Sequence, residues 1–185
     1  MPTNHAILQW GQLTSGRFCA RYPLRKNRRQ LMKQYALVID HEACWGCRTC
    51  EVACKQENGA ADGIRLIQVW EDGPKMVDGN VDFVFQVSVC RHCDDPPCAD
   101  TCPEEAIIKR EDGIVVMYYD QCTGCQLCVE ACPYNAIAFD ADKGIAQKCN
   151  LCHHRVEKGL LPACADNVCL AHCIHFGKTE EENHV

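Results

Sequence analysis

Cysteines gathered in four tight groups constrain this chain more than any other feature. Sixteen of the 18 cysteines belong to these groups, and most neighbours within a group are separated by two to four residues. The groups are Cys44, Cys47, Cys50 and Cys54; Cys90, Cys93, Cys98 and Cys102; Cys122, Cys125, Cys128 and Cys132; and Cys149, Cys152, Cys164 and Cys169. A chain with so many grouped thiols must bring them together, so its core is expected to form around them.

The spacing of these cysteines is typical of iron–sulfur ligands. The run C-x2-C-x2-C-x3-C followed by proline wraps thiolates around a [4Fe–4S] cluster, and proline follows both Cys102 and Cys132. Disulfides would be spread along loops of a secreted domain rather than bunched. Structural zinc would use C-x2-C pairs but would leave the third and fourth cysteine of each group unexplained. We therefore predict four [4Fe–4S] clusters, with a zinc-binding interaction module as the alternative.

An internal repeat predicts the local structure around the middle groups. Cys102-Pro-Glu-Glu-Ala106-Ile107 and Cys132-Pro-Tyr-Asn-Ala136-Ile137 are each followed by a glycine, Gly113 or Gly144, and then by another cysteine group. Apolar residues on both sides of these glycines predict two short hairpins, since glycine supplies the positive φ that a tight turn needs.

Two longer stretches between the groups also have recognisable patterns. Residues Ile64–Trp70 and Asp82–Val89 predict the strands of an inserted hairpin, with turn-forming residues at 72–74 and 78–80. A short helix is expected at about His153–Gly159, within the wide gap of the fourth group.

Taken together, the four groups resemble the four-cluster iron–sulfur subunits of molybdenum and tungsten oxidoreductases, such as those of dimethyl sulfoxide reductase, polysulfide reductase and formate dehydrogenase. The resemblance covers about residues 35–177 and includes all sixteen expected cysteines. It implies an α+β fold of tandem bacterial-ferredoxin-like units, with short hairpins and short helices around the clusters and one inserted hairpin.

The resemblance also implies which cysteines share a cluster, because the fourth cysteine of each group crosses to the paired group. The outer pair of clusters is cluster 1, held by Cys44, Cys47, Cys50 and Cys169, and cluster 4, held by Cys54, Cys149, Cys152 and Cys164. The inner pair is cluster 2, held by Cys90, Cys93, Cys98 and Cys132, and cluster 3, held by Cys102, Cys122, Cys125 and Cys128.

The fourth group departs from the family pattern. Four residues separate Cys164 from Cys169, where three are expected, and Leu170 stands in place of the proline. Aligning Cys169 with Cys102 puts Cys173 at the position of Ala106. Cys169 is the preferred ligand of cluster 1 and Cys173 an alternative one; loss of an outer cluster would leave three.

Charge and length indicate the domain organisation. Residues 1–33 hold seven of the 19 basic residues and no acid, which leaves a net charge of −13 for the rest of the chain. We predict a basic N-terminal arm at 1–33, a four-cluster domain at 34–178 with the inserted hairpin at 62–89, and a polar tail at 179–185. The acidic body argues against nucleic acid as a partner.

Two features that the sequence lacks, a membrane-spanning segment and an export signal, indicate where the protein is located in the cell. No apolar stretch is long enough to span a bilayer, so direct membrane insertion is not expected. Arg28-Arg29 resembles a twin-arginine signal, but no apolar region follows it. A cytoplasmic protein is expected.

Apart from the cysteine groups, the sequence contains no motif that indicates catalysis or nucleotide binding. Neither the G-x-G-x-x-G nor the G-x4-G-K-[ST] pattern occurs, so we expect a non-catalytic electron-transfer subunit. The resemblance implies a catalytic subunit with molybdenum or tungsten as partner, including a tungsten pterin enzyme of the aldehyde oxidoreductase or class II benzoyl-coenzyme A reductase type, and a further redox protein. A free-standing cytoplasmic polyferredoxin is the alternative.

Several other residues near the cysteines could have a functional role. Histidines at positions 92, 153, 154, 172 and 175 could in principle bind metal, but sixteen cysteines already suffice, so ordinary structural roles are favoured. Trp45 could shield a cluster from water or have a packing role alone, and Gly46 and Gly124 are expected to let the backbone curl closely around a cluster. Cys19 is expected to be a free thiol.

Overall fold

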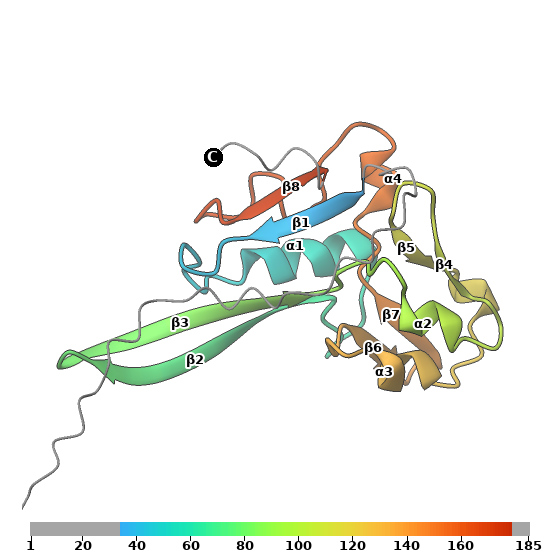
Figure 1. The fold of residues 1–185 in the computed structure, drawn as a ribbon, viewed down its shortest axis with the longest axis horizontal. Coiled ribbons are helices and arrows are strands. Elements are labelled where there is room, and N and C mark those ends of the chain that lie inside the picture. Colours follow the sequence, from blue (N-terminus) through green and yellow to red (C-terminus); the bar gives the residue numbers. More distant parts are fainter. Residues whose placement is uncertain (1–33, 179–185) are drawn as a thin grey trace, which may run out of the picture. The chain divides into compact units, whose positions relative to one another are not determined.

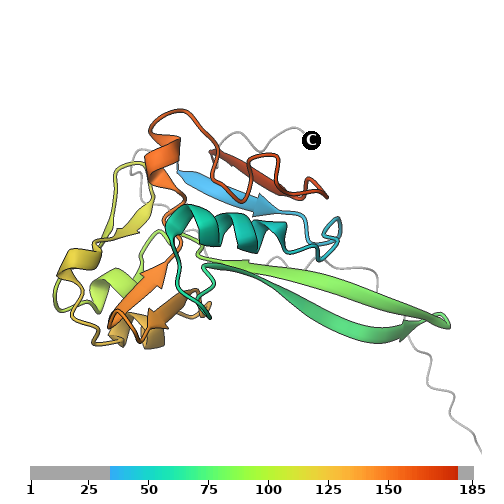
Figure 2. The same cartoon turned by 180° about the vertical axis from the view of Figure 1, so that it is seen from behind.

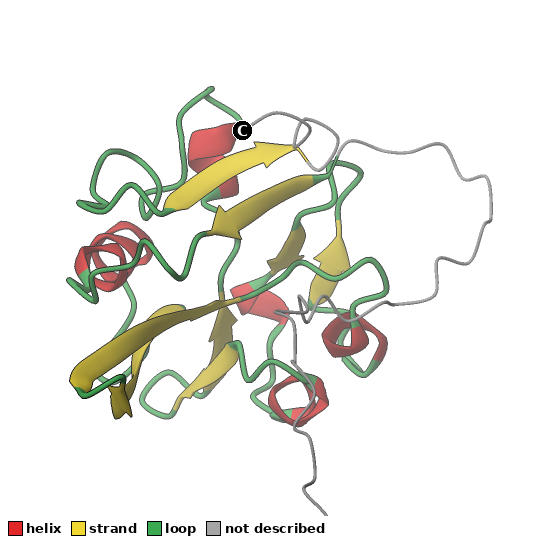
Figure 3. Cartoon of the chain, turned by 60° about the vertical axis from the view of Figure 1, so that its left-hand side comes forward, coloured by secondary structure: helices red, strands yellow, loops and turns green. Residues whose placement is uncertain are grey.

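A computed structural model describes residues 34–178 of the chain. Its strands form four separate two-stranded antiparallel sheets, joined by loops and short helices (Figures 1 and 3). The elements in chain order are β1 (Tyr35–Ile39), α1 (Thr49–Asn58), β2 (Ile67–Val77), β3 (Asn80–Val89), α2 (Pro97–Asp100), β4 (Ile107–Lys109), β5 (Val115–Met117), the 3-10 helix η1 (Tyr119–Gln121), α3 (Leu127–Ala131), β6 (Ile137–Asp140), β7 (Ile145–Lys148), α4 (His153–Val156) and β8 (Ile174–Lys178). The predicted arm at 1–33, the tail at 179–185 and Cys19 lie outside the described residues.

The first and last strands of the described residues pair with each other. β1 and β8 run antiparallel, with Leu37 opposite Phe176 and Ile39 opposite Ile174. The ring of Tyr35 stacks on Phe176 with centroids 5.2 Å apart. This pairing joins the segment before the first cysteine group to the segment after the last, so groups one and four are held side by side.

Helix α1 carries two cysteines of the first group on one face. Cys50 and Cys54 are both buried and one helical turn apart, and the helix ends at Gly59, whose φ of 57° closes it in the left-handed conformation. In Figures 1 and 2 the helix lies between the β1–β8 pair and the base of the β2–β3 hairpin.

The inserted hairpin is present and is longer than predicted. Its first strand continues from Ile67 to Val77, so residues 72–74 form an irregularity within the strand rather than a turn, and the chain reverses at Asp78 and Gly79, which have φ values of 51° and 81°. Only the base packs into the protein, through Ile67, Val69 and Val87. Towards the tip the apolar side chains are exposed, among them Trp70, Met76, Val81 and Phe83.

The two short hairpins predicted from the repeat are confirmed. β4 pairs with β5 and β6 pairs with β7, and Gly113 and Gly144 in the turns have φ values of 83° and 67°. Each hairpin follows a short helix that carries a cysteine, α2 with Cys98 or α3 with Cys128. The predicted helix in group four begins at His153 as expected and ends earlier, at Val156.

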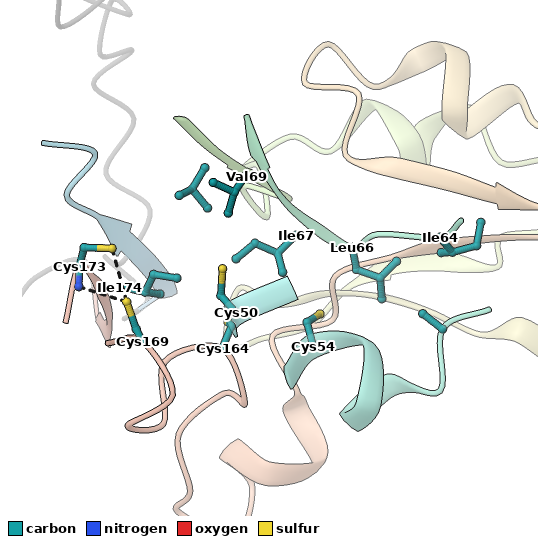
Figure 4. Close-up of a cluster of buried hydrophobic side chains, with 12 residues drawn as sticks. Cys50, Cys54, Ile64, Leu66, Ile67, Val69, Cys164, Cys169, Cys173 and Ile174 are labelled. Atoms are coloured by element: carbon teal, nitrogen blue, oxygen red, sulfur yellow. Dashed lines mark hydrogen bonds between the residues drawn. The ribbon is translucent and has the colours of Figure 1, made fainter. Parts of the chain in front are cut away.

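Cysteines form a large part of the buried core. One cluster of buried side chains joins five cysteines to aliphatic residues of β2, β3, β8 and the segment between α1 and β2 (Figure 4): Cys50, Cys54, Cys164, Cys169 and Cys173 with Ile64, Leu66, Ile67, Val69, Val87 and Ile174, together with Ala60. A second cluster packs Cys98 and Cys128 against the two short hairpins. A third, smaller one joins Ile114, Val116 and Leu151. The aliphatic core alone is thin, as expected for a fold built around metal centres.

Within residues 34–178, no helix has the length and hydrophobicity to cross a lipid bilayer.

Candidate iron–sulfur centres

The inner cysteines line two pockets. Cys90, Cys93, Cys98 and Cys132 line one pocket together with Pro97 and Pro133. Cys102, Cys122, Cys125 and Cys128 line another, together with Ile107 and Met117. Each pocket therefore takes three cysteines from one group and one from the other, because α2 and α3 pack against each other.

The outer cysteines are brought together by α1, the loop after β7 and the segment before β8. Besides burial, the charges of Cys169 and Cys47 raise the pKa of Cys50, and the charge of Cys152 raises the pKa of Cys54, so these cysteines are neighbours. Asn58, one turn after Cys54 on α1, has its Nδ2 atom 3.6 Å from Cys54 Sγ and 4.0 Å from Cys152 Sγ. The Thr49 hydroxyl donates to the Val168 carbonyl at 2.8 Å, which ties the start of α1 to the residue before Cys169.

The same turn occurs after the fourth cysteine of three groups. In each, a residue with φ near 50° precedes an amide that donates to the cysteine Sγ at 3.4 Å. The three amide-to-sulfur pairs are Ala106 to Cys102, Ala136 to Cys132, and Cys173 to Cys169. The fourth group therefore forms the turn at Cys169 despite its extra residue and its missing proline.

Burial and crowding disfavour ionisation of the thiols in the metal-free chain. Burial raises the pKa of Cys98 to about 11 and the pKa values of Cys50 and Cys54 to about 12, with neighbouring thiolates adding to each. Burial also raises the pKa of Cys149 well above its ordinary value, and the charge of Cys90 adds to it. Such thiols carry protons until a metal displaces them, so loading of the sites releases protons.

Two cysteines in the sets are exposed, Cys47 of the first group and Cys125 of the third. A hydrogen bond with the Thr49 side chain lowers the pKa of Cys47, in contrast to the buried thiols. Trp45 beside Cys47 is 66 % exposed; the expectation that it packs over a cluster therefore finds no support in its burial.

Two buried polar residues beside the cysteines were not predicted from the sequence. Lys148, directly before Cys149, is 1 % exposed, and His92, between Cys90 and Cys93, is 3 % exposed. His92 Nδ1 accepts a hydrogen bond from the Val115 amide at 3.0 Å. This bond leaves the proton of a neutral imidazole on Nε2, which is buried and has no hydrogen-bond partner among the described residues. Lys148 stands at the end of a short strand, where no local sequence pattern indicates burial.

The remaining histidines make contacts within the chain. His154 Nε2 lies 2.7 Å from Glu57 Oε1, which links α4 to α1. His153 lies 3.5 Å from Glu157. His172 supplies the φ of 50° in the turn before Cys173, and His175 lies in β8 opposite Val38.

Glycine is sterically required at both of the predicted loop positions, Gly46 and Gly124. A Cβ at Gly124 would lie 2.2 Å from the Gly144 carbonyl oxygen, and a Cβ at Gly46 would lie 2.3 Å from the Phe85 ring. Both glycines have positive φ values, 74° and 67°. They allow the cysteine loops to approach a neighbouring hairpin closely.

The donor set of these sites fits iron–sulfur clusters. All 17 cysteines among the described residues are free of disulfide bonds, backbone amides point at ligand sulfurs, and the buried His92 Nε2 lacks an acceptor from the protein itself. In the described part of the chain, no three His, Cys, Asp or Glu side chains are arranged around a single metal ion. A cubane binds each thiolate at a separate iron, so its ligands need not converge on one point.

Comparisons with known families agree with this interpretation. The model of the 4Fe-4S dicluster domain matches residues 81–179, and that of a 4Fe-4S binding domain matches residues 41–59. Together the matched segments include all four cysteine groups.

Several curated proteins are similar along most of the chain. A subunit of the tetrathionate reductase of Salmonella typhimurium is 39 % identical over 173 residues, covering 87 % of this chain and 68 % of the relative. A component of the polysulfide reductase of Wolinella succinogenes is 38 % identical, covering 80 % of this chain and 78 % of the relative. A component of the anaerobic dimethyl sulfoxide reductase of Escherichia coli is 37 % identical, with 80 % and 75 % covered. This protein belongs to the 4Fe-4S dicluster family of iron–sulfur subunits, electron-transfer proteins of oxidoreductase complexes that bind multiple [4Fe–4S] clusters.

Proposed function

We propose that this chain relays single electrons through four [4Fe–4S] clusters to or from a molybdenum-containing catalytic subunit. The ligand sets are those expected from the resemblance, with cluster 1 on Cys44, Cys47, Cys50 and Cys169; cluster 2 on Cys90, Cys93, Cys98 and Cys132; cluster 3 on Cys102, Cys122, Cys125 and Cys128; and cluster 4 on Cys54, Cys149, Cys152 and Cys164. When bound, these clusters supply one-electron redox chemistry. The two cluster pairs correspond to tandem ferredoxin-like units.

The observation that carries this proposal is that neighbouring cysteine sets form a continuous series. Cys50 and Cys54 on one face of α1 place set 1 beside set 4. Lys148 and Val115 link set 4 to set 2, because Lys148 Nζ donates to the carbonyls of Cys149 and Val115, and Val115 lines the pocket of set 2. Sets 2 and 3 share α2, α3 and the loops between them. The resulting order is 1, 4, 2, 3.

Exposure within this series supports a relay with two ends. The exposed cysteines, Cys47 and Cys125, belong to sets 1 and 3, the first and last in the order. In set 4, by contrast, all four cysteines are buried. A redox partner at either end would therefore approach an exposed ligand, while the cysteines of set 4 within the series are shielded from water.

The catalytic partner is proposed from the relatives. Those described above are parts of reductases named for tetrathionate, polysulfide and dimethyl sulfoxide, and this supports a molybdenum enzyme. A tungsten enzyme of the aldehyde oxidoreductase or benzoyl-coenzyme A reductase type, with a further redox protein and a cytoplasmic location, is the narrower proposal. The hairpin β2–β3, exposed and apolar towards its tip, offers surface for a stable subunit contact.

Anaerobic purification of the tagged chain from its native host tests the proposal. We expect a large subunit to co-elute with about one molybdenum per chain; tungsten in its place would support the narrower proposal. A chain that elutes alone, brown and without either metal would contradict the subunit role and support a free-standing polyferredoxin. A colourless chain with zinc would contradict electron transfer altogether.

A further inference from the structure

Lys148 is the largest fully buried side chain of the described residues, although it carries an amino group. It ends β7 directly before Cys149. Its Nζ donates to the carbonyl of Cys149 at 2.8 Å and, over a shorter distance, to the carbonyl of Val115. These two bonds satisfy part of the hydrogen-bonding capacity of an ammonium, but carbonyls supply no net negative charge.

No acidic side chain compensates this charge. None of the ion pairs within residues 34–178 includes Lys148. Asp140, the buried carboxylate on the same hairpin, interacts with Gln147 and Lys143 instead. A buried ammonium without a counter-charge is strongly unfavourable, so a negative group that the side chains do not provide is to be expected nearby.

The surroundings of Lys148 indicate where that negative group lies. Val115, whose carbonyl accepts from Lys148 Nζ, lines the pocket of set 2 beside Cys98. The amide of the same Val115 donates to Nδ1 of His92, which lies between Cys90 and Cys93. On its other side, Lys148 is bonded to the backbone of Cys149, which belongs to set 4. Lys148 therefore lies at the junction between the inner and outer pairs.

We propose that Lys148 is the internal counter-charge of clusters 2 and 4 and raises the reduction potentials of both. This inference rests on the proposed function, because it requires clusters in these two sets. A [4Fe–4S] core with four thiolates is anionic, and reduction adds a further negative charge. A fixed positive charge in a region shielded from water favours the reduced form. The electron is thereby stabilised where it crosses from one pair to the other.

The test is an EPR-monitored redox titration of the full chain in its native complex, at one pH, for the wild type and three variants. Lys148→Met and Lys148→Gln remove the charge, and Lys148→Arg retains it. At a given potential, the ratio of reduced to oxidised cluster should be at least tenfold lower in the neutral variants. For a one-electron couple this corresponds to a reduction potential about 59 mV more negative. Only two of the four clusters should show this change. Lys148→Arg should stay close to the wild type.

Lys143→Met is the matched control, because it removes the same charge from a side chain on the same hairpin that is 49 % exposed. It should leave all potentials unchanged. Neutral Lys148 variants with full iron content and unchanged potentials would overturn the inference, as would an equal shift of all clusters. If neither neutral variant retains iron, the conservative variant decides: full iron in Lys148→Arg supports a role of the charge, and loss of iron from Lys148→Arg as well overturns it.

The proposed function and the role of Lys148 can be refuted independently. A wild-type complex without iron would refute the proposed function. A wild-type complex with four clusters whose potentials do not respond to Lys148 would refute only the role of this residue.

Discussion

The Sγ atoms of Cys169 and Cys173 lie 3.5 Å apart, and the Cys173 amide donates to Cys169 Sγ at 3.4 Å. Cys173 thus occupies the place that Ala106 and Ala136 take in the two equivalent turns. The backbone turn identifies Cys169 as the residue that corresponds to Cys102 and Cys132, and Cys173 is an additional thiol beside it.

Substitution of these two thiols should therefore have unequal effects. Cys173→Ala should leave the iron content unchanged, because alanine is the residue found in the other two turns. Cys169→Ala should keep its iron with an altered EPR signal for one cluster, since Cys173 is close enough to replace the ligand. The double variant should lose about four iron per chain. Loss of iron from Cys173→Ala alone would show that the two roles are exchanged.

Asn58 is expected to tune cluster 4 through its bonds to two sulfurs. Asn58→Leu removes an amide whose Nδ2 lies 3.6 Å from Cys54 Sγ and 4.0 Å from Cys152 Sγ. Such bonds stabilise added negative charge. Without them, reduction of one cluster should become less favourable by roughly 1 kcal/mol, and its reduction potential should become more negative. Redox titration measures this. Asn80→Leu, on the exposed hairpin, is the control, and a variant with all four potentials unchanged would refute the role.

The contact between α1 and α4 gives a prediction about pH. The hydrogen bond from His154, assisted by the charge of Arg155, lowers the pKa of Glu57. A lowered carboxyl pKa means that the stabilisation is complete above the unfolded value of about 4.3 and is lost as the pH falls. Glu57→Gln should therefore reduce the free energy of unfolding by about 1 kcal/mol at pH 7.

Denaturant titrations that follow far-UV circular dichroism check this pH dependence. The difference in unfolding free energy between wild type and Glu57→Gln should be the same at pH 7 and pH 5 and should narrow below about pH 4.3. Glu111→Gln, exposed and without a hydrogen bond or ion pair among the described residues, should show no difference. A difference that is constant at every pH would mean that the charge of Glu57 is unimportant.

Two glycines of similar backbone conformation should respond differently to alanine. Gly124→Ala places a Cβ 2.2 Å from the Gly144 carbonyl oxygen, whereas a Cβ at Gly144 has nothing within 4 Å. Gly144→Ala should cost about 1–2 kcal/mol for its positive φ alone. Gly124→Ala should in addition disturb the loop of Cys122 and Cys125 and lower the iron content. Equal thermal midpoints for the two variants would contradict the steric explanation.

Local signals in the sequence predicted the inner pair of hairpins well, because each glycine with positive φ lies between short apolar runs. Helix α4 and the inserted hairpin were also predicted, although residues 72–74 were expected in a turn and lie within β2. The pairing of β1 with β8 joins segments more than 130 residues apart, and no local pattern signals such a contact.

Among the site residues, the cysteines could be grouped from spacing and resemblance because ligand spacing is a local property. The burial of Lys148 could not be foreseen, because it involves Val115, which is distant in the sequence and whose carbonyl accepts from Lys148 Nζ. For Trp45, its proximity to Cys47 suggested packing that its exposure does not show. Burial depends on segments distant in the sequence, so neighbouring residues alone do not predict it.

Analysis of iron, acid-labile sulfide and zinc in the anaerobically purified wild-type complex tests the central claim most directly. Four cubanes predict about sixteen iron and sixteen sulfide per chain, with no stoichiometric zinc. About twelve iron would mean that one of the four sets, most simply that of the irregular Cys164–Cys173 segment, does not hold a cluster. Zinc without iron and sulfide would contradict the account.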